Sequence, residues 1–139
     1  MGPGERVVED WSSLRTTERA RMTEACTRCG ACFAACPMTA HAPATAGADA
    51  AATVAGVLGI LAGGAGDAAA RAWVMACGRT GSCNAACPHG VNPMLLMRLA
   101  KFEGQENGTL PKRGAADAMS RVKAFARLTL TEEEQRSWL

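Results

Sequence analysis

The chain has 139 residues and a formal net charge of +2 at pH 7, which suits one compact domain with short extensions. So small a net charge argues against nucleic acid or an anionic membrane surface as a partner. The longest uncharged run near the middle, Ala50 to Gly66, has 17 residues, five of them glycine, while a spanning helix needs roughly 20 mostly apolar residues. We therefore expect no membrane span, and the start of the chain, which lacks an apolar segment, gives no sign of a secretory signal.

The charged residues are concentrated at the two ends of the chain. Residues 25–97 carry five of the 28 charged side chains, so this segment is expected to be buried or covered by a partner. Six phenylalanine and tryptophan residues and no tyrosine are too few for a large aromatic core. Seven cysteines could hold the segment together instead. Their odd number, without a secretory signal, argues against disulfides and favours metal binding in a cytoplasmic protein.

The first half of the chain is predicted to be helical around a cysteine group. A helix is expected over residues 11–25, with its charges on exposed faces. A loop rich in proline and glycine follows the first cysteines, over residues 37–47. Asp49 is then a suitable N-cap for the next helix, and Asp67 caps a second, shorter helix that leads into the second cysteine group.

The second half is predicted to be helical as well. Pro93 fits the first turn of a helix, a loop is expected over residues 103–111, and a further helix covers residues 115–128. Since no segment shows the alternation typical of a strand, the prediction is an all-α fold. The apolar stripes expected on these two helices are Leu95, Leu99 and Phe102 on the first and Met119, Val122 and Phe125 on the second.

The first cysteine group reads Cys26-x2-Cys29-x2-Cys32-x3-Cys36-Pro37. This is the bacterial iron–sulfur run, in which the fourth cysteine ligates the other of two clusters. Three thiolates with two residues between neighbours sit on a loop that wraps one cubane, whereas the fourth, fixed by the proline after it, points away. Zinc sites use paired C-x2-C units and do not need this continuation, so the motif favours iron–sulfur over zinc.

The second cysteine group, Cys77-x5-Cys83-x3-Cys87-Pro88, matches the first at three positions of four, and Thr80 stands where the second cysteine would be. One ligand of a cluster pair is therefore missing. Residues 78–82 offer neither a carboxylate nor an imidazole, which favours a 3Fe–4S cluster there over a second 4Fe–4S cluster with a non-cysteine ligand near Thr80. The crossover rule assigns Cys26, Cys29, Cys32 and Cys87 to cluster I and Cys36, Cys77 and Cys83 to cluster II.

Crossed ligation ties each cluster to both ends of the segment between the motifs, so two inorganic groups replace a large core, as a structural metal does in a small domain. The expected organisation is an N-terminal helical extension over residues 1–24, a dicluster domain over residues 25–105 and a C-terminal helical extension over residues 106–139.

With its motifs in place, the sequence resembles the alpha-helical ferredoxin family. The resemblance rests on C-TR-C-GA-C-FAA-CP, an insert of about 40 residues, and then C-GRTGS-C-NAA-CPHGVNP. That domain occurs in the small iron–sulfur subunit of heterodisulfide reductases and in the iron–sulfur subunit of succinate dehydrogenase and fumarate reductase. The second motif is similar to that of succinate dehydrogenase, which binds a 3Fe–4S cluster there. The short chain and Trp73 before Cys77 are closer to the heterodisulfide reductase subunit, whose second motif usually keeps the cysteine that Thr80 replaces.

The resemblance implies an electron-transfer subunit within a multi-subunit, heterodisulfide reductase-like oxidoreductase. No catalytic residues are identified, because no catalytic triad, phosphate loop, flavin fingerprint or CCG-type cysteine domain is visible, and whether the chain is itself an enzyme stays open. The expected partner is a catalytic subunit, which could carry the CCG-type domain, or a flavoprotein, in a hetero-oligomer. Partners could hold it at the inner face of a membrane. The alternative is a quinone- or substrate-reactive cluster beside Thr80 and His41, as in a succinate dehydrogenase-like enzyme.

Overall fold

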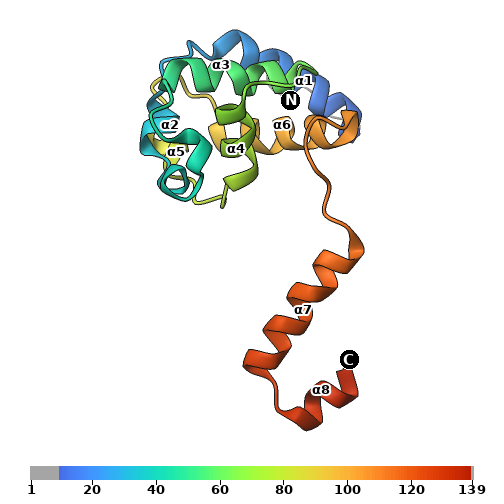
Figure 1. Ribbon diagram of the computed structural model, residues 1–139. Helices are drawn as coiled ribbons and strands as arrows, with labels where there is room; N and C mark the ends of the chain where they lie inside the picture. The colour runs from blue at the N-terminus through green and yellow to red at the C-terminus, as the bar shows by residue number, and fades with distance from the viewer. Residues whose placement is uncertain (1–9, 139) are drawn as a thin grey trace.

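The computed structural model describes residues 10–138, and within that range it contains helices and no strand (Figure 1). The all-α prediction is therefore confirmed. The first nine residues, where the absence of a secretory signal was inferred, lie outside the described residues. The elements are α1 Trp11–Ala25, α2 Ala31–Ala35, the 3-10 helices η1 Pro37–His41 and η2 Pro43–Thr45, α3 Ala50–Leu61, α4 Ala68–Ala76, α5 Ser82–Ala86, α6 Pro93–Asn107, α7 Ala115–Thr129 and α8 Glu132–Trp138.

Polar side chains fix where four of the helices begin. The carboxylate of Asp10 accepts the backbone N–H of Ser13 at 2.7 Å at the start of α1. Asp49 and Asp67 accept backbone N–H groups three residues ahead at 2.8 Å, which confirms both predicted caps. Asn92 caps α6 and places Pro93 in its first turn, where the missing N–H of proline costs nothing.

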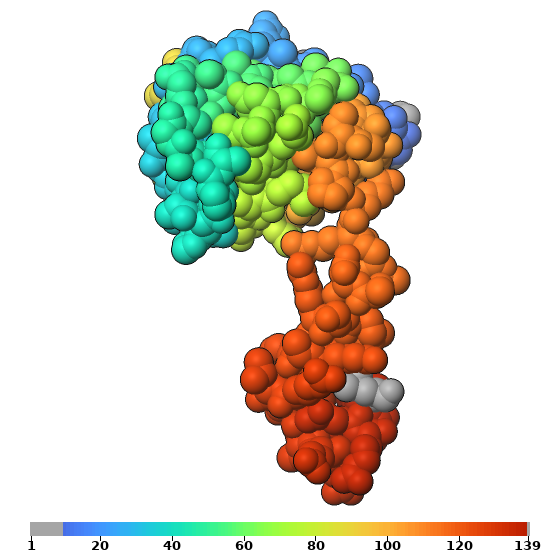
Figure 2. Space-filling view, viewed as in Figure 1, coloured from blue at the N-terminus to red at the C-terminus, as the bar shows by residue number. Residues whose placement is uncertain are grey.

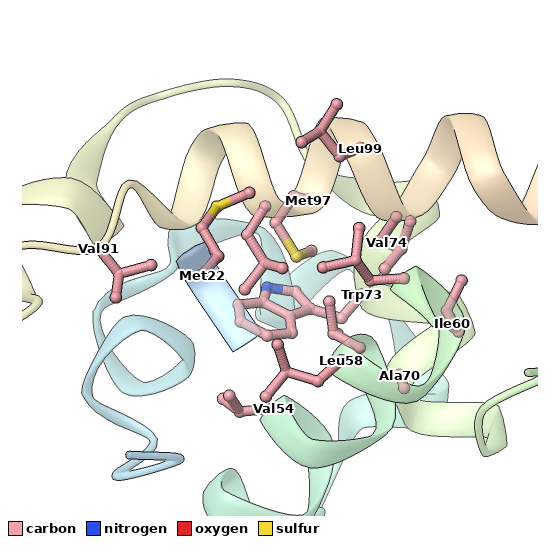
Figure 3. Close-up of a cluster of buried hydrophobic side chains, with 14 of the residues drawn as sticks. Met22, Val54, Leu58, Ile60, Ala70, Trp73, Val74, Val91, Met97 and Leu99 are labelled. Atoms are coloured by element: carbon pink, nitrogen blue, oxygen red, sulfur yellow. The ribbon is translucent and has the colours of Figure 1, made fainter. Parts of the chain in front are cut away.

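The hydrophobic core lies where α3, α4 and α6 pack together, with Met22 of α1 at its edge (Figure 3). The side chains of Val57, Ile60 and Val74 are completely buried. Trp73 is only 2% exposed and lies at the centre of the cluster. Five of the seven cysteines pack against this core, so the apolar contacts hold the cysteine loops in place.

Helix α6 is longer than predicted. The expected loop over residues 103–111 was wrong in its first half, because the helix continues to Asn107 and ends at Gly108, whose φ of 82° suits glycine. Gly104 lies inside the helix and is a packing site: a Cβ there would lie 2.6 Å from the side chain of Leu110. Leu99 is buried as expected, whereas Leu95 and Phe102 are only half-buried; the most buried α6 residues include Leu96, Met97 and Ala100.

The C-terminal helices α7 and α8 extend away from the rest of the molecule as an arm (Figures 1 and 2). Thr131 and Glu134 form a reciprocal cap between the two helices, with the Thr131 N–H 2.8 Å from the Glu134 carboxylate. The predicted apolar stripe of α7 is present but exposed, to 50% at Met119 and 68% at Phe125. Across the described range, none of the helices has the length and apolar character needed to cross a membrane.

Candidate iron–sulfur site

The two cysteine loops have nearly the same backbone. In the first, Arg28 has a φ of 60° and Gly30 a φ of 82°; in the second, Arg79 has a φ of 59° and Gly81 a φ of 76°. Each glycine then precedes a helix of five residues, α2 or α5. A left-handed backbone conformation at equivalent positions lets each loop wrap around a group bound at its centre. The repeat seen in the sequence is therefore a repeat in conformation.

The loops face each other because α2 and α5 pack together. This contact brings the end of each motif to the beginning of the other. One small pocket is lined by four cysteines, three from the first motif and the last of the second: Cys26, Cys29, Cys32 and Cys87.

A second small pocket lies at the other end of the pair. It is lined by the remaining three cysteines, Cys36, Cys77 and Cys83, and by Thr80. The Thr80 hydroxyl lies 3.2 Å from Ser82 Oγ and 3.4 Å from the Ser82 N–H, so it hydrogen-bonds within its own loop. The structure thus sorts the cysteines into the four and the three that the crossover rule groups together, with Thr80 beside the three.

The thiols are unpaired and partly desolvated. All seven cysteines are free, and within residues 10–138 no three His, Cys, Asp or Glu side chains converge on the position of a single metal ion. Burial raises the pKa of Cys32 to about 11 and also raises the pKa of Cys83. A thiolate at such a site needs a cationic partner to offset the lost hydration, and a bound iron would supply that charge.

Comparison with known proteins agrees with this geometry. The sequence matches the 4Fe-4S dicluster domain over residues 22–91, which is half of the chain and includes both cysteine loops. The chain belongs to the 4Fe-4S dicluster domain family. No curated protein and no solved structure shows significant similarity to it. Membership makes the protein an iron–sulfur protein of the electron-transfer type.

Trp73 gives an independent test of whether the residues of the dicluster domain suit an iron–sulfur cluster. Its ring makes an edge-to-face contact with Phe33 of α2, with centroids 5.1 Å apart, and it lines the second pocket. Its buried indole N–H has no hydrogen-bond partner among the described residues, which is costly unless an acceptor is supplied. Inorganic sulfide and thiolate are such acceptors, so donor set and orphaned N–H both fit an iron–sulfur cluster. Sequence reasoning did not identify this unpartnered N–H, although Trp73 lies one helical turn before Cys77.

Other residues close to the cysteine motifs differ in whether they line one of the two pockets. Met38 lines the second pocket and His89 lines the first, although His89 is exposed. His41 ends η1 on the surface and lines neither pocket. Cys29 and Thr80 are exposed, so each pocket reaches the protein surface at the same position of its loop.

Proposed function

We propose that the chain is a one-electron relay in which Cys26, Cys29, Cys32 and Cys87 hold a 4Fe–4S cluster and the second pocket holds a 3Fe–4S cluster. The observation that carries this proposal is the sorting of the cysteines into a group of four and a group of three. When bound, both clusters supply reversible one-electron chemistry. The chain supplies the thiolates, excludes water from one side of each cluster and leaves the other side open.

The same proposal places the chain as a subunit of a larger oxidoreductase, similar to the small iron–sulfur subunit of heterodisulfide reductases. Its support is the resemblance of the motifs, the low charge of residues 25–97 and the exposure of both pockets at the surface. A relay must pass electrons in at one cluster and out at the other, and Cys29 and Thr80 mark two separate points of approach. A catalytic subunit or a flavoprotein would supply the substrate chemistry.

Metal analysis and spectroscopy test the cluster assignment. Anaerobically purified protein is expected to contain about seven iron and about eight acid-labile sulfide per chain, the sum of one 4Fe–4S and one 3Fe–4S cluster. As isolated, it should give a sharp EPR signal near g ≈ 2.01, roughly where an oxidised 3Fe–4S cluster absorbs. Zinc without sulfide would overturn the proposal, and Mössbauer spectra with two complete cubanes would overturn the 3Fe–4S assignment.

The subunit role has a separate test. Purification of the complex from the source organism, followed by native mass spectrometry, should show the chain bound to a second subunit. Identification of that subunit as a protein with its own flavin or CCG-type cysteine domain would support the proposal. A holoprotein that remains a lone monomer of 14.4 kDa and reduces unrelated acceptors at equal rates would contradict it.

A further inference from the structure

A cleft of about 650 Å³ lies beside the second pocket, between the C-terminal end of α4, α6 and the linker to the arm. Cys77 belongs to both the cleft and the second pocket, so an occupant of the cleft would lie next to a cysteine of cluster II. Sequence analysis did not find this cleft, because its charges come from three separate segments. Its basic residues are Arg79, Arg98, Lys101, Lys112 and Arg113.

These cations form no ion pair with an acidic side chain among the described residues. Glu106, the one acid in the described part of the cleft lining, is bound by Arg15 at 2.9 Å, and Glu103 is bound by Arg15 and Arg19 of α1. None of the five cations takes part in a salt bridge within residues 10–138. Helix α6 therefore has its acids Glu103 and Glu106 in ion pairs with α1, whereas its cations in the cleft form no ion pair.

The cations also act on one another. Burial, followed by the charge of Arg113, lowers the pKa of Lys101, and Arg79 and Arg98 contribute in the same direction. Cys77, if ionised, opposes them. An anionic group in the cleft would relieve this repulsion.

We infer that this cleft is the docking surface for an acidic face of the protein that exchanges electrons with cluster II. The inference rests on the proposed relay function and specifies the charge of its partner. A protein surface fits better than a small anion because Arg79, Lys112 and Arg113 are exposed on the rims. The cations are thus spread along the cleft rather than gathered around one buried point. Such an arrangement speeds encounter through steering and orients the partner with its redox centre toward Cys77.

Charge reversal on the exposed rim tests the inference without disturbing the core. The test pair is Lys112→Glu with Arg113→Glu, and the matched control is Arg121→Glu with Lys123→Glu on α7. All four residues are exposed, both pairs change the net charge equally, and the control residues do not line the cleft. The probe is a reduced plant-type ferredoxin, a small acidic protein whose low reduction potential makes it an electron donor. Its 2Fe–2S centre loses one electron, and oxidised cluster II gains it.

Stopped-flow absorbance gives the second-order rate constant, and isothermal titration with oxidised ferredoxin gives the Kd. For the wild-type chain the rate should fall as salt rises, because screening weakens steering. The rim pair should lower the low-salt rate about tenfold and weaken binding, while the control pair changes the rate by less than about twofold. Reduction by the methyl viologen radical cation should not slow in either variant.

Three results would overturn the inference. The first is an unchanged ferredoxin rate in the rim pair, and the second is an equal loss in both pairs, which would reflect total charge alone. The third is tight binding of tripolyphosphate or citrate that competes with ferredoxin, which would make the cleft a small-anion site. If a protein loaded with both clusters accepts no electron from ferredoxin or viologen, the relay function itself fails and the docking inference falls with it.

Discussion

The two cysteine loops have the same backbone but different surroundings. Gly30 of the first is buried, and a Cβ on it would lie 2.6 Å from the Cβ of Ala50 on α3. Gly81 of the second has the same left-handed conformation, yet a Cβ there would meet nothing within 4 Å. The first loop is therefore fixed by packing as well as by its own conformation. The second keeps that conformation although Thr80 replaces a cysteine, so glycine placement rather than a full ligand set defines the loop.

The largest expected effect is the loss of one cluster when one of its cysteine ligands is removed. Cys87→Ala should abolish cluster I and leave cluster II, although residue 87 belongs to the second motif, because Cys87 lies in the pocket of the first three cysteines. Iron should fall from about seven to about three per chain, with the 3Fe–4S EPR signal retained. Cys36→Ala is the matched variant and should remove that signal instead. A reversed pattern, measured by metal analysis and EPR, would disprove crossed ligation.

The next largest effect is expected when the second loop is given the same number of cysteines as the first. Thr80→Cys restores the cysteine that the first loop has at Cys29, so cluster II should become a 4Fe–4S cluster with a potential lower by on the order of 0.1 V. The EPR signal of the oxidised 3Fe–4S cluster should disappear, and protein-film voltammetry should show the shift. Thr80→Val is the control, since it removes the hydroxyl without adding a ligand. An EPR signal that persists in Thr80→Cys would show that residue 80 is not at the vacant corner.

A smaller effect, on the free energy of unfolding, is expected from the different packing around the two loops. Gly81→Ala should cost about 1–2 kcal/mol, the penalty of an L-residue in left-handed backbone. Gly30→Ala should cost about 2–5 kcal/mol, because overpacking against Ala50 is added to the same penalty. Anaerobic urea unfolding followed by visible absorbance measures both. Ala50→Gly in the Gly30→Ala background should recover part of the loss; equal costs at the two glycines would contradict the difference in packing.

The smallest effect should be similar in the two loops, although Arg28 donates a long hydrogen bond to the Cys26 carbonyl and Arg79 lines the basic cleft. Arg28 and Arg79 both have left-handed backbone and both are exposed. Replacing either by glycine should stabilise the protein by about 0.5 kcal/mol, because the relief of the left-handed conformation slightly exceeds the greater entropy of the unfolded glycine chain. The same urea midpoints test this expectation. A clearly smaller stabilisation for Arg28→Gly than for Arg79→Gly would mean that the hydrogen bond from the Arg28 guanidinium to the Cys26 carbonyl, 3.4 Å long, contributes to stability.

Much of the fold could be predicted because its determinants are local. The caps at Asp49 and Asp67 and the proline at 93 act within one helical turn, so the sequence alone located the starts of their helices. The end of α6 could not be predicted, because the place of Gly104 is decided by Leu110 packing on it from beyond the helix. The pattern of α7 revealed an apolar face, but a pattern does not tell whether anything covers that face.

The candidate site also has some features that could be predicted from the sequence and others that could not. The spacing of the motifs predicts a group of four cysteines and a group of three, and the cysteines that line the two pockets divide in the same way; that these groups ligate clusters stays a prediction. The buried N–H of Trp73 and the basic cleft were not predictable, because both depend on which side of a helix faces a segment distant in sequence.

The distribution of tryptophan has a spectroscopic consequence. The chain has three tryptophans and no tyrosine, so its intrinsic fluorescence comes from Trp11, Trp73 and Trp138 alone. Trp73 is 2% exposed and lines the second pocket, whereas Trp11 and Trp138 are 49% and 79% exposed. A metal cluster quenches the indole nearest to it, so blue-shifted emission from Trp73 should emerge as cluster II is lost. Red-shifted emission from the exposed Trp11 and Trp138 should remain, so the emission wavelength distinguishes the tryptophan beside the second pocket from the two at the surface.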